Sequence, residues 1–183
     1  MTSLLVVSDS HVHNATLQGI FQAHPDISIC LHCGDIQDDP ASLKIETLYL
    51  VQGNTDVPTM PKELIIEIDH YQILIVHGHE QVVEDGLDDL VAYGKTKNVD
   101  LICYGHTHHP MVAKRDDLTI LNPGSVAFPR GGKVFVPTYA IVDLGDDLTI
   151  HFYHAKTHAC VDDLVLGSPT KKKKKSFFSF LKR

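Results

Sequence analysis

Residues of the types that bind metal ions follow several short apolar runs along the chain. Each run is followed by aspartate, asparagine or histidine, and a glycine stands beside most of these residues. In an open α/β sheet, the loops at the carboxyl ends of the strands converge, so side chains that are distant in sequence can meet there. We therefore expect these residues to form one ligand set. The set is Asp9, His11, Asp35, Asn54, His77, His106 and His108.

This ligand set combines carboxylate, imidazole and amide groups and contains no thiolate. Such ligands suit Mn²⁺, Fe, Zn²⁺ or Ni²⁺, and a closed structural zinc site normally uses thiolates. Seven ligands match two divalent ions that share one carboxylate. We expect Mn²⁺, with Ni²⁺, Zn²⁺, Fe or Mg²⁺ as alternatives. Paired ions activate water and clamp the oxygens of a phosphoryl group, which predicts hydrolysis of a phosphate ester by a hydroxide that bridges the two ions.

Charge is distributed very unevenly along the 183 residues. All 23 acidic residues precede Gly167, whereas seven of the 16 basic residues lie among the last 13. The body therefore carries a net charge of −14 and the tail +7. An acidic body argues against specific nucleic-acid binding, which needs a basic face. A phosphate substrate would need local positive charge, and bound metal would provide it.

The apolar runs predict strands, and the later part of the chain alternates short β-like runs with turns. Strands that alternate with helices indicate an α/β fold, and the later runs indicate a mixed sheet or a second sheet. Residues 63–68 and 72–76 predict a hairpin. The other predicted strands span residues 4–7, 27–31, 47–51 and 101–104.

Two helices are predicted between these strands. The first spans residues 14–24, with Asn14 as its N-cap and Pro25 beyond its end. The second spans residues 84–97 and has an amphipathic pattern.

We expect a single domain over residues 1–167 and a flexible basic tail over residues 168–183. The chain has no apolar run of the roughly 20 residues that a membrane-spanning helix needs and no secretory signal, so we expect a cytoplasmic protein. The tail contains five lysines followed by phenylalanines, and this pattern is compatible with two interpretations of its function. One is weak contact with a membrane surface; the other is a solubilising tail. Tethering to nucleic acid is a third and weaker option.

The ordered blocks resemble the calcineurin-like metallophosphoesterases. That family's pattern is Asp-x-His, Gly-Asp-x-x-Asp, Gly-Asn-His-Asp/Glu, a later histidine and Gly-His-x-His. The resemblance covers residues 3 to about 155. The short chain and the segment Asn122-Pro-Gly-Ser125 look most like the small bacterial phosphodiesterase branch, which is related to the retromer subunit. The matching blocks here are Asp9-Ser-His11, Gly34-Asp35-Ile-Gln-Asp38, Gly53-Asn54-Thr55-Asp56, His77-Gly-His79 and Gly105-His106-Thr-His108.

The resemblance implies a sandwich of two β-sheets flanked by helices, an α/β/β/α fold, and a phosphodiesterase more than a phosphomonoesterase. It also implies how two ions would be held, with Asp35 as the bridge. The first ion would take Asp9, His11, Asp35 and His108. The second ion would take Asp35, Asn54, His77 and His106.

One position departs from the family pattern. The family places a histidine after the asparagine as the general acid, and Thr55 stands there in this chain, although Asp38, which would orient that histidine, is present. A threonine hydroxyl cannot act as an acid near pH 7. Either another group protonates the leaving oxygen, or the substrate has a good leaving group. We predict catalytic roles for Asp35, Asn54, His106 and Asp38, and substrate contacts for Asn54, Thr55 and His79; His13 is a weaker candidate.

The cysteine spacing and the alternative functions are less informative than the ligand blocks. Cys30-Leu-His-Cys33 has the spacing of a redox pair or half a zinc site, but alternation along a strand sends the two side chains to different environments, and we favour free, buried thiols. A competing function on the same fold is a catalytically weak or inactive scaffold for other proteins. A small phosphate ester is the expected partner, and a homo-oligomer is an alternative that the sequence leaves open.

Overall fold

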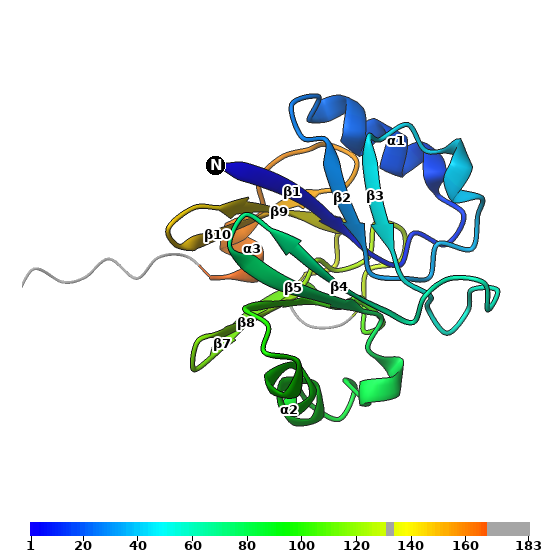
Figure 1. Ribbon diagram of the computed structural model, residues 1–183. Helices are drawn as coiled ribbons and strands as arrows, with labels where there is room; N and C mark the ends of the chain where they lie inside the picture. The colour runs from blue at the N-terminus through cyan, green and yellow to red at the C-terminus, as the bar shows by residue number, and fades with distance from the viewer. Residues whose placement is uncertain (131–133, 168–183) are drawn as a thin grey trace, which may run out of the picture.

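The computed structural model describes residues 1–130 and 134–167, and these form two β-sheets packed face to face with helices on their outer faces (Figure 1). Each sheet has five strands. The predicted α/β/β/α sandwich is thus confirmed. No helix within the described residues is long and apolar enough to cross a bilayer. The predicted tail, residues 168–183, lies outside the described part of the chain.

The first sheet has the strand order β10-β9-β1-β2-β3. Strands β1, β2 and β3 pair in parallel, and β9 and β10 add antiparallel at the edge next to β1. Alternate residues of β1 point to opposite faces, so Leu4 and Val6 enter the space between the sheets while Leu5 and Val7 face outward. The bounds are β1 Thr2–Val7, β2 Ile29–His32, β3 Thr47–Leu50, β9 Thr138–Leu144 and β10 Leu148–His154.

The second sheet has the order β4-β5-β6-β8-β7. Its three central strands are parallel, and β4 and β7 are antiparallel edges. The predicted hairpin is confirmed as β4 and β5. The bounds are β4 Glu63–Ile68, β5 Tyr71–Val76, β6 Leu101–Cys103, β7 Met111–Arg115 and β8 Leu118–Asn122.

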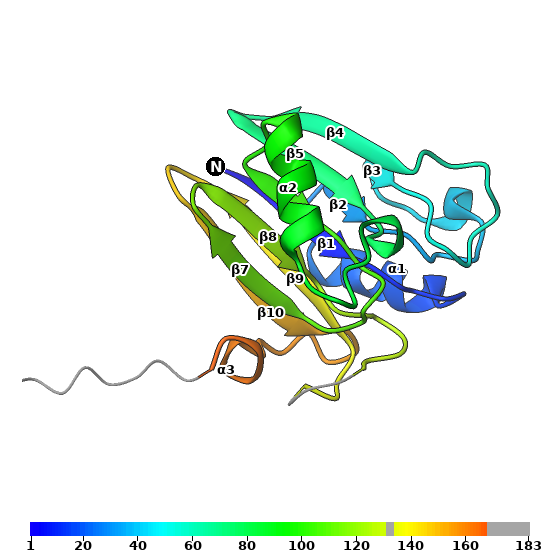
Figure 2. The same cartoon turned by 90° about the horizontal axis from the view of Figure 1, so that it is seen from below.

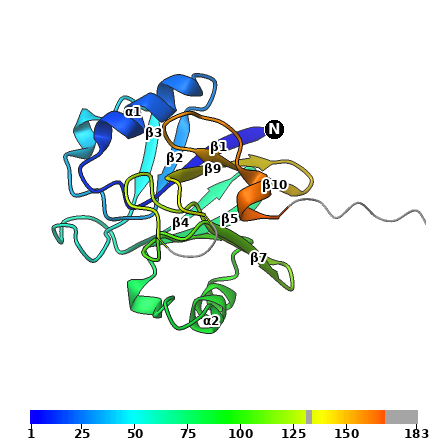
Figure 3. The same cartoon turned by 180° about the vertical axis from the view of Figure 1, so that it is seen from behind.

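Helices cover the outer face of each sheet (Figures 1 and 2). Helix α1, Asn14–Ala23, packs Leu17, Ile20 and Phe21 on the first sheet, and α2, Asp88–Lys97, packs on the second. A short helix, α3, Asp162–Val165, lies next to β10, as the view from behind also shows (Figure 3). Short 3₁₀ turns span Pro40–Ser42 and His79–Gln81.

Two details of the predicted helices were wrong. The N-cap of α1 is His13, and the Asn14 side chain instead donates to Asp39 O and Ser42 Oγ across the neighbouring loop. Helix α2 begins at Asp88 and not at residue 84, because Gly86 has a φ of +143°, which is incompatible with a continuous right-handed helix.

The two cysteines of the C-x-x-C segment lie on opposite sides of the first sheet. Cys30 packs under α1, and Cys33 packs between the sheets. Both are buried free thiols, and burial raises the pKa of each. The expectation of free, buried thiols is therefore confirmed for this pair.

Candidate metal centre

Loops from both sheets meet at the carboxyl ends of the parallel strands. The loop after β1 is bonded to the loop after β2 through Asp9 N–H and Gly34 O, 3.0 Å apart. The loop after β6 reaches both sheets, since Gly105 N–H donates to His77 O and His106 N–H donates to Asp9 Oδ2. The loop after β3 joins them through Thr55 N–H, which donates to Asp35 Oδ1. Five loops, those after β1, β2, β3, β5 and β6, are thereby fixed relative to one another, and they carry all seven predicted ligands.

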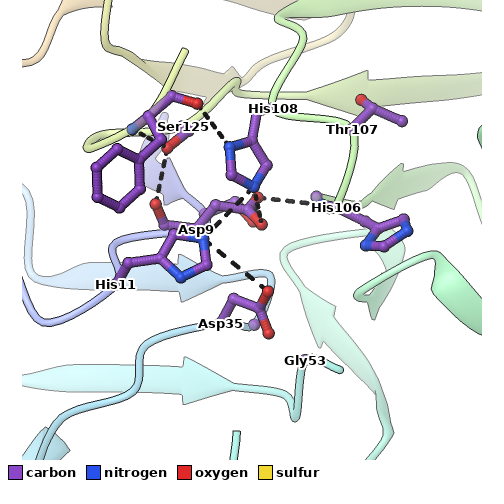
Figure 4. A network of polar contacts seen from close by, with 12 residues as sticks. Asp9, His11, Asp35, Gly53, His106, Thr107, His108 and Ser125 are labelled. Atoms are coloured by element: carbon purple, nitrogen blue, oxygen red, sulfur yellow. Dashed lines mark hydrogen bonds and ion pairs between the residues drawn. The ribbon is translucent and has the colours of Figure 1, made fainter. Parts of the chain in front are cut away.

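Three predicted ligands form a tight cluster that we call the first half-site: Asp9, His11 and His108. The Nε2 atoms of the two histidines lie 3.4 Å apart, and His108 Nε2 lies 3.2 Å from Asp9 Oδ1. Figure 4 shows these side chains pointing toward one another from two loops, the one after β1 and the one after β6. The three donor atoms lie within 4.8 Å of one another, close enough to bind one ion.

Three more form what we call the second half-site: Asp35, Asn54 and His77. His77 Nε2 lies 3.5 Å from Asp35 Oδ2 and 2.9 Å from Asn54 Oδ1. Asp35 Oδ2 is also 4.0 Å from His11 Nε2, so this carboxylate oxygen faces both half-sites. Donor atoms of Asp9, Asp35 and His77 likewise fall within 4.8 Å of one another.

The histidines of both half-sites are oriented by oxygen acceptors on their Nδ1 atoms. His108 Nδ1 donates to Phe128 O, His77 Nδ1 to Cys33 O, and His11 Nδ1 to Gln37 Oε1, all within 2.6–2.7 Å. An acceptor at Nδ1 fixes the proton there and leaves the Nε2 lone pair for a metal ion. The three Nε2 atoms all face the centre of the site.

His106 is the exception among the predicted ligands. Its Nε2 donates to Glu84 Oε1, on the loop before α2, and Figure 4 shows its ring turned away from Asp9. The imidazole belongs to neither group of converging donor atoms. His106 still lies at the edge of the second half-site, since its ring centroid is 5.1 Å from that of His77. With Nε2 engaged, Nδ1 is the atom that His106 can offer to an ion.

The donor set fits divalent cations. Asp9 Oδ1 is buried, and no hydrogen-bond donor meets it among the described residues, a costly arrangement for a carboxylate unless a cation compensates it. In the first half-site, two imidazole lone pairs also face each other at 3.4 Å. A cation between these groups would remove both sources of repulsion.

Proton affinities in the second half-site point the same way. Burial lowers the pKa of His77, but the carboxylates of Asp35 and Asp9 and the hydrogen bond to the Cys33 carbonyl together outweigh burial and leave the pKa raised. Burial raises the pKa of Asp35, yet His77 and the N–H of Thr55 hold it well below its ordinary value. A negative carboxylate thus attracts a proton onto the neighbouring imidazole, in the place where a metal ion would supply the charge.

The backbone at the ligands is unusual. Five predicted ligands have a positive φ, between 41° and 68°, in the region that non-glycine residues seldom adopt. Strain of this kind concentrates at functional sites, where the surrounding structure enforces it. The five residues are Asp9, His11, Asp35, His106 and His108.

Close packing behind the first half-site requires glycine at position 105. A Cβ there would lie 1.9 Å from Ser8 Oγ and 2.7 Å from Asp9 Oδ2. Ser8 Oγ in turn donates to Asp9 Oδ2 at 2.5 Å. Any larger residue would displace the Asp9 carboxylate.

Three polar residues that position these loops were missed by the sequence analysis as participants. Asp56 accepts hydrogen bonds from the N–H groups of Asp35, Gly53 and Gln37, each at 2.8 Å. Asp56 belongs to the block Gly53-Asn-Thr-Asp56, but the family pattern predicted a role for Asp38 and none for Asp56.

Ser125 and His32 also stabilise the loops that carry the predicted ligands. Ser125 Oγ donates to Asp9 O and accepts from Phe128 N–H, so one hydroxyl links Asp9 to the residue that orients His108. His32 is fully buried and contacts Ser10 Oγ and the N–H of Gly34. Burial lowers the pKa of His32 to about 4. Its only sequence signal was a histidine at the end of an apolar run.

The remaining predicted residues lie around the rim. Asp38 is exposed and caps the N–H of Asp39; no hydrogen bond between the described residues joins it to Thr55. Thr55 and Asn54 are exposed beside Asp35. His79 has a buried Nδ1 without a described partner, with its ring 5.3 Å from that of His77. His13 turns its Nδ1 to the carbonyls of Ser10 and His11.

Fold and site together define a member of a known class. Residues 2–147 match the model of the calcineurin-like phosphoesterase superfamily domain. The chain belongs to this superfamily, as the ordered blocks indicated.

Curated relatives agree with this assignment. The probable metallophosphoesterase YsnB of Bacillus subtilis is 30% identical over 154 residues, which cover 82% of this chain and 90% of YsnB. The phosphodiesterase MJ0936 of Methanocaldococcus jannaschii is 28% identical over 159 residues, covering 75% and 90%.

Solved structures share the fold. A predicted phosphoesterase from Streptococcus pneumoniae superposes with a TM-score of 0.81 at 25% identity, over 89% of this chain and 94% of the other. Vps29 of Chaetomium thermophilum superposes with a TM-score of 0.72 at 22% identity, over 87% and 93%. At that identity the Vps29 match bears on the fold alone.

Proposed function

We propose that this protein is a metal-dependent phosphodiesterase that works with two divalent ions, with Mn²⁺ the expected metal. The observation that carries the proposal is the convergence of three Nε2 atoms and two aspartates, with Asp35 Oδ2 facing both half-sites. A relative named as a phosphodiesterase supports the preference for diesters.

Each half-site has a defined part in this proposal. Asp9, His11 and His108 hold the first ion, Asp35 bridges, and Asn54, His77 and the Nδ1 of His106 hold the second. When bound, such ions supply positive charge and a water of lowered pKa. Asn54 is exposed at the rim, where its amide can also meet a phosphate oxygen. The two aspartates neutralise only part of the ions' charge, so an acidic protein can still attract a phosphate here.

The departing alcohol has no evident acid at position 55. Thr55 uses its N–H to hold Asp35, and its hydroxyl cannot donate a proton near pH 7. His79, whose ring lies 5.3 Å from that of His77, is an imidazole outside the ligand set, but burial lowers its pKa below the ordinary value, so it is neutral at pH 7. The proposal therefore favours substrates whose alcohol leaves readily.

An interaction scaffold is the second candidate function, because the chain shares its fold with Vps29. A scaffold has no need for converging donor atoms. Here the three Nε2 atoms and Asp9 are already aligned, which favours the enzyme.

The test is hydrolysis by protein that has been stripped with a chelator. Bis-p-nitrophenyl phosphate and p-nitrophenyl phosphate would be offered with Mn²⁺, Ni²⁺, Zn²⁺ or Mg²⁺ added back singly. Turnover restored by metal, and faster with the diester, is the expected result. A protein that binds two ions but hydrolyses neither ester with any of them would overturn the proposal in favour of the scaffold.

A further inference from the structure

A cleft of about 450 Å³ opens beside the candidate metal centre and shares His106 with it. This volume lies within the ~300–1,000 Å³ typical of small-molecule sites. The cleft runs from His106 toward the loop that precedes α2. A molecule held at the two half-sites could therefore extend directly into it.

The inner wall of the cleft is apolar and firmly held. Val83 and Tyr104 are buried, and Leu87 and Met111 pack on the same core cluster beneath α2. Tyr104 Oη donates to Met111 Sδ at 3.0 Å, so its hydroxyl proton already has an acceptor within the wall. The wall is also tied to the centre, because Val83 N–H donates to Gly78 O, next to His77.

The mouth of the cleft carries Arg130. Its backbone N–H donates to His108 O, which anchors it to a ligand loop. Its guanidinium is exposed and has no ion pair among the described residues, whereas Lys62, Lys95 and Lys97 each pair with an acidic residue. Guanidinium is well suited to phosphate oxygens because it offers donors in a fixed fork.

A second cleft near the centre has different chemistry. Its volume is about 310 Å³, and its lining includes apolar residues such as Val57 and Met60 but also Asp38 and Asp56, with no cation and no predicted ligand. Two carboxylates without a cation would repel an anionic ester. The cleft at His106 has one carboxylate, that of Glu84, which His106 engages, and it combines an apolar wall with Arg130.

We propose that the cleft beside His106 binds one alcohol arm of a phosphodiester, an arm that carries an aromatic or branched aliphatic group, while Arg130 pairs with a phosphate oxygen. This inference rests on the proposed function and names its substrate class. A phosphomonoester of a small polar alcohol would leave the apolar wall exposed to water, and such wall area contributes to binding only when it is covered.

The test compares two diesters with the same leaving group and different second arms. Bis-p-nitrophenyl phosphate carries an aryl second arm, and methyl p-nitrophenyl phosphate a small one. The quantity of interest is the ratio of kcat/KM for the aryl diester to that for the methyl diester, measured with Mn²⁺. Intrinsic reactivity cancels when a variant's ratio is divided by that of the parent chain.

Two substitutions probe the two parts of the cleft. Leu87→Gln should lower the ratio about fivefold, equivalent to about 1 kcal/mol, because a polar side chain then faces the aryl group. Arg130→Gln should lower kcat/KM for both diesters about tenfold and leave the ratio unchanged. The matched controls are Leu164→Gln on α3, an exposed leucine, and Arg115→Gln at the far end of β7. Both controls should behave like the parent chain.

An unchanged ratio in Leu87→Gln would overturn the proposal, as would equal activity of Arg130→Gln and Arg115→Gln. Met111→Gln serves as a second wall variant if circular dichroism shows that Leu87→Gln is misfolded.

Calorimetric binding of diphenyl phosphate and dimethyl phosphate to the Mn²⁺-loaded protein gives a readout that does not depend on turnover. The parent chain should prefer diphenyl phosphate, and a wall variant should lose that preference; equal affinities in the parent chain would rule the cleft out. A chain that hydrolyses no ester with any ion refutes the proposed function, and the binding test still decides the cleft.

Discussion

The two half-sites differ in how completely the protein prepares them. In the first, Asp9, His11 and His108 converge without any rearrangement, and hydrogen bonds from the loops of both sheets hold them. In the second, Asp35 and His77 are equally well fixed, but Asn54 is exposed and the His106 imidazole is engaged by Glu84. Preorganised ligands bind with less loss of entropy. The two ions should therefore bind unequally, with the tighter ion at the first half-site.

The largest expected effect comes from the residue that the half-sites share. Asp35→Asn removes the negative charge that faces both ions, so activity should fall by at least about a hundredfold, since even partners behind a ligand cost 10–100-fold. The number of bound ions, counted by elemental analysis after desalting, should fall below two. Asp26→Asn, an exposed aspartate near the end of α1, is the control. Two ions and near-parental turnover in Asp35→Asn would refute the bridge.

A pair of histidine substitutions would test the inequality directly. His108→Gln removes a fixed ligand of the first half-site and should weaken the tighter ion by about a hundredfold, whereas His106→Gln should weaken the looser ion by about tenfold and spare the tighter one. Isothermal titration of stripped protein with Mn²⁺ separates the two events. Equal losses of affinity in the two variants would show that the two half-sites do not differ in strength.

A smaller effect is expected from Glu84, which touches His106 and no other predicted ligand. Because a carboxylate on Nε2 fixes the proton there and leaves Nδ1 for an ion, Glu84→Gln should weaken the looser ion by roughly tenfold. Glu80→Gln is the matched control, because Glu80 lies in the same segment between β5 and α2 and its carboxylate pairs with Lys62 instead of a predicted ligand. Tighter binding in Glu84→Gln would mean that Glu84 competes with the ion for His106.

The smallest expected effect comes from His32, which contacts the loops of both half-sites and should therefore change the stability of the protein instead of the affinity of one ion. Burial lowers its pKa from 6.5 to about 4. The unfolded chain therefore binds more protons between these values, and stability should fall as the pH is lowered from about 6.5 to about 4. His32→Asn should flatten this part of the profile, measured by urea unfolding of stripped protein, while exposed His70→Asn should not. A profile unchanged by His32→Asn would show that other groups set the acid sensitivity.

The fold class could be predicted from the sequence, as could the grouping of the proposed ligands at one edge of the sheets, because both rest on local patterns. Apolar runs followed by ligand residues marked the strands and the edge of the sheets where they end, and the hairpin followed from two runs around a short turn. The start of α2 could not be predicted well, since it depends on the backbone conformation of Gly86. The roles of Glu84, Asp56 and Ser125 could not be predicted, because their hydrogen-bond partners come from other loops. Only the assembled structure brings these hydrogen-bonding groups together.

The positive φ values at five predicted ligands also bear on how such a chain can change over evolutionary time. Each of these left-handed backbone conformations destabilises the folded chain, and it would do so less if the residue were glycine or asparagine. Selection for thermal stability alone would therefore favour replacing these aspartates and histidines, and the fold would survive the exchange. On the proposed function, this chain gives up some stability at these five positions for ligand geometry. A lineage released from that geometry could drift toward a sturdier protein whose loops serve other purposes.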